Sequence, residues 1–428
     1  MDRLLRRGGR IIDPANKVDA RLDLLVADGV VAALGKGLDA PEDARIIDAA
    51  GKVVAPGLID MHVHLREPGR EDEETVETGC LAAAAGGFTA VAAMPNTDPV
   101  TDNQAAVGFI IREAIRSGYA NVYPVGAITK GLAGESLAEM GGMIEAGAVA
   151  FTDDGHCVTS AEMMLKAMKY STIFDVPVIN HCEDKSLVGS GAMNAGLVAT
   201  RLGLPGIAAE SEEIIVYRDC ALARLSGARY HVAHLSCARA ASIVERFKSE
   251  GVRVTAEVTP HHLVLTDSAV EGYNTNAKMA PPLRSASDVK ALREALAAGV
   301  IDCIATDHAP HHYNEKEAAF ADAPNGVIGL ETAFPVLYTH LVLTGVLSLP
   351  SLIDKMSPSP ARVLGVPGGT LAQGAAADIT VLDVETKWRI DKNRFYSKSR
   401  NTPFQDMEVT GRAVATLVGG RLVWELDG

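Results

Sequence analysis

Histidines, aspartates and one arginine recur at the ends of short apolar runs along this chain. The stretch "PGLIDMHVHLREPG" (residues 56–69) places His62, His64 and Arg66 two residues apart, within and just after an apolar run. Residues i and i+2 of a strand point to the same face, so this spacing predicts that the three side chains point together. Other apolar runs end in residues of similar chemistry: Asn96, Asp153, His181, His234, His261, Asp307 and His308.

Imidazole and carboxylate groups without thiolates are ligands for Zn²⁺, Mn²⁺ or Fe²⁺, and zinc is the commonest of these ions in such sites. One histidine alone is more often structural, but several candidates on separate strand ends predict a metal site. Six ligands are too many for one catalytic ion with an open position, so they predict two divalent metal ions, with zinc the first candidate. The predicted ligands are His62, His64, Asp153, His181, His234 and Asp307.

Eight apolar runs alternate with helical segments that often end in glycine, which predicts a parallel (β/α)8 barrel over residues 55–365. In such barrels the chemistry gathers at the carboxyl ends of the strands, where these polar residues fall. Residues 1–54 and 366–428 carry short β-branched runs broken by glycine, so they predict a small β-sandwich domain built from both chain ends.

Composition excludes several classes of protein. The chain has 428 residues, of which 47% are hydrophobic, and a net charge of -14, which argues against a nucleic-acid or membrane-surface partner. No signal peptide and no apolar run of about 18 residues is apparent, so we expect a cytoplasmic protein. The six cysteines form no C-x-x-C pair and are expected to be reduced.

The sequence resembles the amidohydrolase superfamily and, among its cyclic amidohydrolases, the class I dihydroorotases. The resemblance covers essentially the whole chain, and three of its motifs are highly specific when taken together: "DMHVHLREPG" (60–69), "MPNT" (94–97) and "TDHAPH" (306–311). The supporting motifs are "FTDDG" (151–155), "NHCED" (180–184), "HVAHLS" (231–236), "VTPHHL" (258–263), "GLET" (329–332) and "SRNTPF" (399–404).

The resemblance implies a role for each candidate residue. His62, His64 and Asp307 would bind one metal ion, and His181 and His234 the other. Asp153 would bridge the two ions, and Asp307 would also act as the acid/base group. Arg66, Asn96 and His311 would receive the carboxylate of the substrate. The resemblance implies substrate contacts at His64, Arg66, Asn96, Ala280, His311, Asn325 and Gly326.

Two positions depart from the class pattern. Ala280 stands before the paired prolines where the family usually has asparagine, and Asn325 stands in Pro324-Asn325-Gly326 where the family often has phenylalanine. Both positions lie in loops that contact the substrate ring in relatives. Asn325 is therefore a candidate to supply the polar contact that Ala280 lacks.

The segment from Ala146 to His156 contains no lysine. Hydantoinases, dihydropyrimidinases and allantoinases bridge their metals with a carbamylated lysine on this strand, so its absence favours a dihydroorotase. Asp153 and Asp154 are neighbours and must point to opposite faces of a strand. The resemblance selects Asp153 as the bridge, which leaves Asp154 facing outward or packed behind the ligands.

The activity implied is the reversible hydrolysis of L-dihydroorotate to N-carbamoyl-L-aspartate in pyrimidine biosynthesis, by a metal-bridged hydroxide with Asp307 as acid/base. One alternative is another cyclic amidohydrolase, namely a hydantoinase, dihydropyrimidinase or allantoinase. A second is a non-catalytic partner of aspartate carbamoyltransferase, which the presence of all six ligand positions disfavours. The expected partners are a small-molecule substrate, a second copy of the chain in a homodimer, and aspartate carbamoyltransferase.

Overall fold

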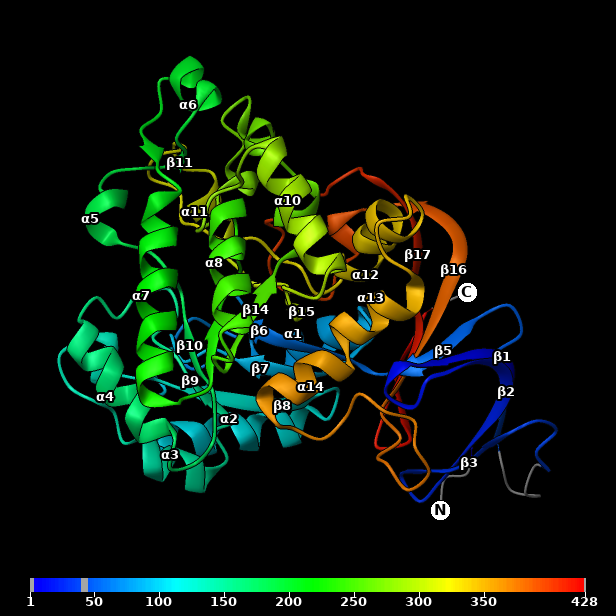
Figure 1. The fold of residues 1–428 in the computed structure, drawn as a ribbon. Coiled ribbons are helices and arrows are strands. Elements are labelled where there is room, and N and C mark those ends of the chain that lie inside the picture. The colour runs from blue at the N-terminus through cyan, green and yellow to red at the C-terminus, as the bar shows by residue number, and fades with distance from the viewer. Residues whose placement is uncertain (1–3, 40–44, 427–428) are drawn as a thin grey trace.

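Eight parallel strands form a barrel at the centre of the protein (Figure 1). The computed structural model describes residues 4–39 and 45–426. The barrel strands follow one another in chain order around the sheet: β6 (Leu58–Val63), β7 (Phe88–Ala93), β8 (Asn121–Gly126), β9 (Ala150–Phe151), β10 (Val178–Asn180), β13 (Tyr230–Val232), β14 (Val254–Val258) and β15 (Cys303–Ile304). A bridge between Val63 and His308, beyond the end of β15, joins the last strand to the first. The predicted (β/α)8 barrel is confirmed.

The predicted helices surround the barrel and bury one face each. In α2 (Gln104–Ser117), Val107, Ile110 and Ala114 are buried, a spacing that places them on one face of a helix. Asn103 caps this helix at its beginning, and Gly118 ends it in the left-handed conformation. The other outer helices are α1 (Val76–Ala85), α3 (Met140–Ala146), α4 (Ala161–Ser171), α7 (Glu210–Ser226), α8 (Ala238–Ser249), α10 (Ala286–Ala297), α13 (Leu349–Met356) and α14 (Pro358–Leu364). Among the described helices, none is long and apolar enough to cross a membrane.

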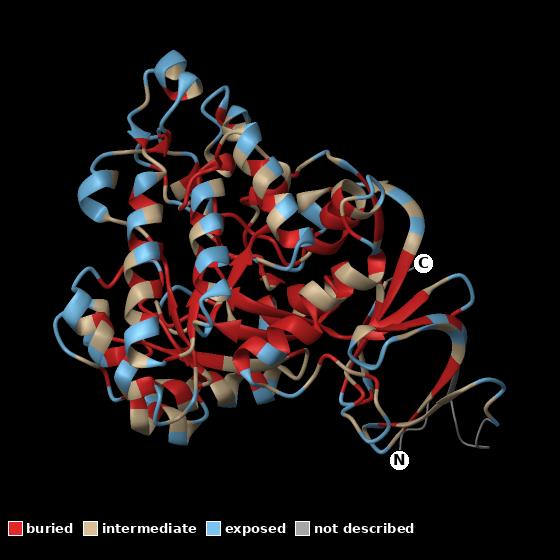
Figure 2. Cartoon of the chain, viewed as in Figure 1, coloured by how far each residue is buried: buried red, intermediate tan, exposed pale blue. Residues whose placement is uncertain are grey.

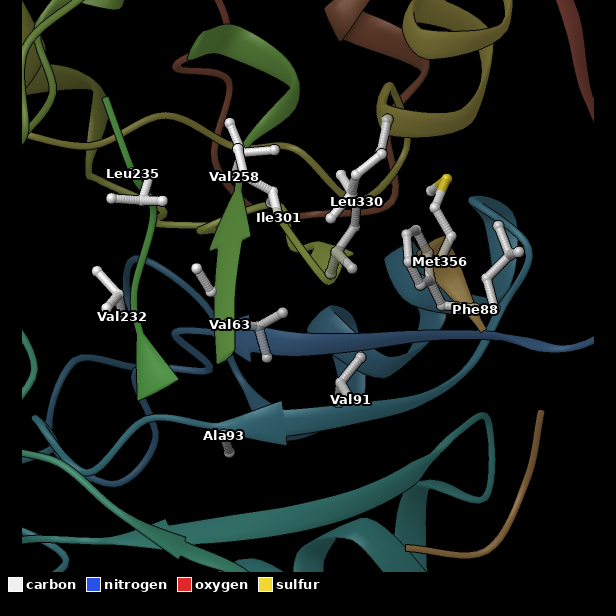
Figure 3. Packing of buried hydrophobic residues seen from close by; sticks show 14 of the residues in the cluster. Val63, Phe88, Val91, Ala93, Val232, Leu235, Val258, Ile301, Leu330 and Met356 are labelled. Atoms are coloured by element: carbon white, nitrogen blue, oxygen red, sulfur yellow. The ribbon is translucent and has the colours of Figure 1, made fainter. Parts of the chain in front are cut away.

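The apolar side chains of the strands separate into two layers. Residues such as Phe88, Val91 and Val258 face outward and pack in the large core (Figure 3). Smaller side chains such as Ala92, Ala150 and Cys303 face inward and fill the barrel. The strands are buried along their length, whereas the outer helices expose their distal faces (Figure 2).

The two chain ends form one eight-stranded sheet beside the barrel. Its strands are β1 (Leu4–Asp13), β2 (Val18–Ala27), β3 (Val30–Gly35), β4 (Arg45–Asp48), β5 (Val53–Pro56), β16 (Ile379–Arg389), β17 (Glu408–Val418) and β18 (Arg421–Glu425). Strand β5 pairs with both β1 and β16, so it joins the amino-terminal strands to the carboxyl-terminal strands. The predicted small β domain is confirmed. Its exact bounds stay a prediction, and residues 1–3, 40–44 and 427–428 of the predicted domain lie outside the described residues.

Several short elements follow the barrel strands and were not predicted. Between β10 and α7 the chain forms α5 (Lys185–Val188), β11 (Met193–Asn194), α6 (Leu197–Leu202) and β12 (Gly206–Ile207). Figure 1 shows α6 and β11 beyond the amino-terminal end of α7. The carboxyl ends of the barrel strands lie on this same side. The remaining additions are α9 (Pro260–Val264), η3 (Asp267–Val270), η4 (Thr275–Ala277), α11 (Tyr313–Lys316), α12 (Ala333–Leu337) and η5 (Tyr338–Val342).

Candidate metal and substrate site

The inward face of the barrel continues past the ends of the strands into a group of polar side chains. Because side chains alternate along a strand, every second residue beyond an inward-facing one shares its face. Ala92, Ala150, Ile179 and Cys303 belong to the inner core. Counting onward by twos leads to residues that all line a single pocket: Asn96, Asp154, His181 and Asp307.

Two histidines of the first strand meet two carboxylates at the bottom of this pocket. Asp154 lies 3.3 Å from Nε2 of His62 and 3.4 Å from Nε2 of His64. Asp307 Oδ1 lies 3.1 Å from His64 Nε2 and 3.6 Å from His62 Nε2. His62, His64 and Asp307 place one ligand atom each within 4.8 Å of one another, and all three are buried. The structure therefore brings these predicted ligands together.

His181 and His234 approach the same carboxylate. His181 Nδ1 lies 2.9 Å from His234 Nε2, and these nitrogens lie 4.0 and 3.8 Å from Asp154 Oδ1, respectively. Asp154 therefore lies within 4.0 Å of a ring nitrogen of each of the four histidines.

The predicted placement of the two neighbouring aspartates is wrong, because Asp154, and not Asp153, lies against the histidines. The side chain of Asp153 points away from the histidines and accepts hydrogen bonds from the backbone N–H groups of Ile128 and Thr129, at 2.8 and 2.9 Å, and from the Thr129 hydroxyl. The reason lies in the strand register. Phe151 faces the outer core, so Asp153 shares its outward face, whereas Ala150 faces the barrel interior together with Asp154.

Several buried polar atoms in this cluster lack a hydrogen-bond partner. His62 Nε2, Asp154 Oδ1 and His234 Nδ1 have none among the described residues, and neither has Nε2 of the neighbouring His261. An unsatisfied buried polar atom is costly, so native structures rarely leave several side by side without a ligand. Imidazole nitrogens and carboxylate oxygens are ligands for divalent metals. The residues present therefore fit divalent metal ions.

The charges of the cluster also suit cations. Burial alone would raise the pKa of Asp307. The hydrogen bond from His64 and the charge of His62 outweigh burial, so the pKa of Asp307 lies below its ordinary value. Burial likewise opposes ionisation of Asp154, yet the positive charges of His62 and His64 hold its pKa well below the usual range. Both carboxylates are thus ionised at neutral pH.

Glu257 orients the first histidine and was missed by the sequence analysis. Its Oε1 lies 2.7 Å from His62 Nδ1, and its Oε2 lies 3.2 Å from His231 Nε2. Burial opposes its ionisation, but the positive charge of His62 lowers its pKa to about 2. A carboxylate on the far nitrogen of a ligating histidine fixes the ring's orientation and tautomer. A charged residue inside the apolar strand "VTAEV" was the signal for this role.

A cationic group faces the cluster from the rim of the pocket. Arg66 follows β6 with a left-handed backbone, φ 61°. His234 and Asp307 within the cluster also have positive φ, which is uncommon for non-glycine residues. Arg66 Nη2 lies 3.5 Å from His311 Nε2. Both side chains contact the buried carboxylate of Glu73, which the sequence analysis also missed.

The pocket has a volume of about 730 Å³ and is lined by all seven predicted substrate-contact positions. Asn96 accepts a hydrogen bond at Oδ1 from His64 Nδ1 at 2.8 Å, so its amide nitrogen stays available as a donor. Ala280 and Asn325 line the same pocket. This arrangement is required if Asn325 supplies the polar contact that Ala280 lacks. A β-carbon on Gly326 would lie 2.8 Å from His311 Nε2, so only glycine fits at this position without displacing the imidazole.

Comparison with known proteins shows where this arrangement recurs. A family model described as dihydro-orotase-like matches residues 51–240, and a model of the amidohydrolase family matches residues 223–424. A dihydroorotase of Geobacter metallireducens is 52% identical over 99% of this chain and 99% of its own length. A dihydroorotase of Syntrophotalea carbinolica is 53% identical over 99% of this chain and 100% of its own length.

The chain belongs to the dihydroorotase family of amidohydrolases. The predicted resemblance is confirmed, and the chain is an enzyme of the cyclic amidohydrolase type. Among solved structures, the L-hydantoinase of Arthrobacter aurescens matches with a TM-score of 0.90 and 29% identity, over 99% of this chain and 96% of its own. The dihydroorotase family and this hydantoinase therefore share the barrel and the small β domain.

Proposed function

We propose that this enzyme reversibly hydrolyses L-dihydroorotate to N-carbamoyl-L-aspartate, the ring-closing direction serving pyrimidine biosynthesis. One observation carries the proposal: Arg66 and His311 line the same pocket as the histidine–aspartate cluster. An arginine fork recognises a carboxylate, and the cluster fits the hydrolysis of an amide. A small ring that carries both an amide and a carboxylate matches this pair of features.

We propose that the cluster holds two divalent metal ions, with zinc the first candidate. His62, His64 and Asp307 would hold one ion, His181 and His234 the other, and Asp154 would lie between them. When bound, such ions polarise a carbonyl oxygen and lower the pKa of water to about 7. The donor set contains no thiolate, which suits zinc, manganese or iron.

Side chains of the pocket would bind the substrate and transfer the proton. Arg66, the Asn96 amide and His311 would hold the substrate carboxylate and so fix the ring amide above the cluster. Asp307, ionised before reaction, would accept the proton of the attacking water at a carboxylate oxygen. The carbon–nitrogen bond of the ring then breaks, and Asp307 would return the proton to the departing nitrogen. Ring closure follows the same steps in reverse.

A different cyclic amide is the competing substrate class, since the solved structures that match are hydantoinases. Two features favour an acidic substrate. Arg66 offers a cation in the pocket with which an uncharged ring such as hydantoin cannot form an ion pair. The segment 146–156 contains no lysine that could be carbamylated between the metals.

Turnover of L-dihydroorotate, dihydrouracil, hydantoin and allantoin by metal-loaded protein tests the proposal. We expect L-dihydroorotate to be the best substrate by kcat/KM. In Arg66→Met we expect kcat/KM for L-dihydroorotate to fall by the equivalent of about 2–5 kcal/mol, because the bound carboxylate loses a buried charge partner. The exposed Arg239 supplies the control Arg239→Met, which should behave as wild type. Faster turnover of any uncharged ring than of L-dihydroorotate would contradict the proposal.

Assembly and location stay predictions. We propose a homodimer that associates with aspartate carbamoyltransferase, on the resemblance alone. A cytoplasmic location is supported by the cysteines, all six of which are free and buried. Size-exclusion chromatography of the purified chain, alone and mixed with the carbamoyltransferase, tests both associations.

A further inference from the structure

A second pocket lies between the barrel and the small β domain. Its volume is about 800 Å³, and it shares no lining residue with the active-site pocket. Its walls come from the end of α1, from α12 and from strands β16, β17 and β18. Figure 1 shows α12 close to β16 and β17, on the side of the molecule where the chain ends.

Aromatic side chains form much of this junction pocket. The chain contains only two tryptophans, and both Trp388 and Trp424 line it. Tyr396 meets Trp424 edge to face, with ring centroids 6.4 Å apart. Phe395, which precedes Tyr396 in the chain, also lines the pocket. Aromatic walls of this kind bind planar rings by stacking and by edge-to-face contact.

Three arginines line the same pocket. Arg412 lies over the ring of Trp388, with its Cζ 5.8 Å from the ring centroid, while Arg389 pairs with Glu408. Among the described residues, Arg394 forms no ion pair within 4.0 Å. Of the two acids in the lining, Glu331 has its pKa raised to about 8 by burial, so it is largely uncharged at neutral pH. The lining is therefore net positive.

Two buried donors of the pocket have no partner. The Nε of Arg412 and the Nε1 of Trp424 are inaccessible to solvent and make no hydrogen bond to any described residue. Trp424 is only 9% exposed. Leaving such donors unpaired is costly, and because both atoms are closed to solvent, a ligand could reach them only if the walls of the pocket move.

We propose that the junction pocket is a second ligand site, which binds a planar aromatic molecule carrying a carboxylate or a phosphate. The ring would pack against the two tryptophans and Tyr396, and the anionic group would accept from Arg412 and Arg394. A purely apolar ligand would leave the positive charge of the lining unneutralised, and a small anion without a ring would leave the aromatic walls uncovered. The combination of both features selects the aromatic anion.

Tryptophan fluorescence tests this site directly, since both tryptophans lie in it. Adenosine 5′-monophosphate and nicotinate serve as a phosphate-bearing and a carboxylate-bearing probe, with adenosine and nicotinamide as their uncharged counterparts. We expect a saturable change in emission with at least one charged probe, and at least tenfold weaker binding of its counterpart. The stronger of the two charged probes identifies which anionic group the site takes.

Variants then locate the binding. Arg412→Met and, separately, Arg394→Met should each weaken the probe at least tenfold, while Arg421→Met, on β18 but outside the lining, should not. Arg66→Met in the active site should leave the signal unchanged. The proposal is overturned if neither charged probe gives a saturable change, or if the response is lost in Arg66→Met but kept in both Arg412→Met and Arg394→Met. Emission that depends on protein concentration but on neither probe would assign the pocket to a contact between copies and also overturn it.

Discussion

The carboxylate of Glu73 lies 3.2 Å from Nε of Arg66, and both side chains are largely buried. The same carboxylate lies 3.1 Å from Nδ1 of His311. Burial opposes the ionisation of Glu73, but a hydrogen bond from His311 and the charge of Arg66 lower its pKa to about 2. One buried anion therefore holds both Arg66 and His311 in place, although no substrate contact of its own is required.

We expect Glu73→Gln to raise KM for L-dihydroorotate about tenfold or more, with a smaller effect on kcat. The glutamine keeps the shape but removes the charge, and a hydrogen bond to a charged group contributes about 1.5–3 kcal/mol. Steady-state kinetics measure this split, and dihydrouracil, which has no carboxylate, should be turned over as by wild type. Glu77→Gln on the exposed face of α1 is the matched control. An unchanged KM in Glu73→Gln would show that Arg66 and His311 keep their places without it.

Asp307→Asn should lower kcat by at least the factor of about 10²–10⁴ that a general acid/base contributes. Asparagine cannot accept the proton that the proposed reaction requires. The pH–rate profile should lose one limb, and because neighbouring groups titrate together, its apparent pKa values belong to the whole site. Near-native kcat in this variant would mean that another residue, such as His308 or His311, moves the proton.

Glu257→Gln should weaken metal binding by about 10–100-fold, the usual effect of removing the partner of a ligating histidine. The expected reason is that His62 Nδ1 loses the carboxylate that fixes its ring. Competition with a chelator measures the affinity without any assay of turnover. The exposed Glu245 on α8 supplies the control variant Glu245→Gln. Equal metal affinity in Glu257→Gln and wild type would remove Glu257 from this role.

Lys316 should make the stability of the fold depend on pH. Burial lowers its pKa from 10.5 to about 7, so between these values the folded chain binds fewer protons than the unfolded chain. The free energy of unfolding should therefore rise with pH in this window, by up to about 1.4 kcal/mol per pH unit from this group. Denaturant titrations should show a shallower rise in Lys316→Met than in wild type or in the exposed control Lys290→Met. The same slope in all three proteins would contradict the assignment.

Lys316 also links this pH dependence to the substrate pocket. Its Nζ donates to the carbonyl oxygens of Pro324 and Gly326, at 2.9 and 3.0 Å, on either side of Asn325. Loss of these contacts in Lys316→Met should therefore raise KM as well.

Periodicity and motif position were enough to predict the barrel, the small β domain and most of the residues in the pocket. Most strands of the barrel are buried along their length, so their apolar runs are recognisable in the sequence, and their carboxyl ends meet at one end of the barrel. His181 and Asp307 fall on the inward face by simple alternation. Their predicted chemical roles stay predictions until metal and turnover are measured.

The choice between Asp153 and Asp154 could not be made from the position of the motif alone. Strand β9 ends at Phe151, before both aspartates, so the face of each depends on the residues that precede them. The small Ala150 and the large Phe151 would have placed Asp154 inward, because the interior of the barrel admits the smaller side chain. Glu257 lies 195 residues from His62 and Glu73 lies 238 residues from His311, so only the folded chain shows those pairs.

The metal content of two matched variants tests the central claim, which is that six residues with Asp154 at their centre hold two metal ions. Asp154→Asn and Asp153→Asn are to be purified identically, checked for folding by thermal melting, and analysed for metal per chain. We predict about two ions per chain in wild type and in folded Asp153→Asn. The native Asp153 side chain only accepts hydrogen bonds from the backbone of Ile128 and Thr129, in the loop after β8. Asp154→Asn should lose at least one ion. Two ions in Asp154→Asn together with a loss in Asp153→Asn would contradict the account.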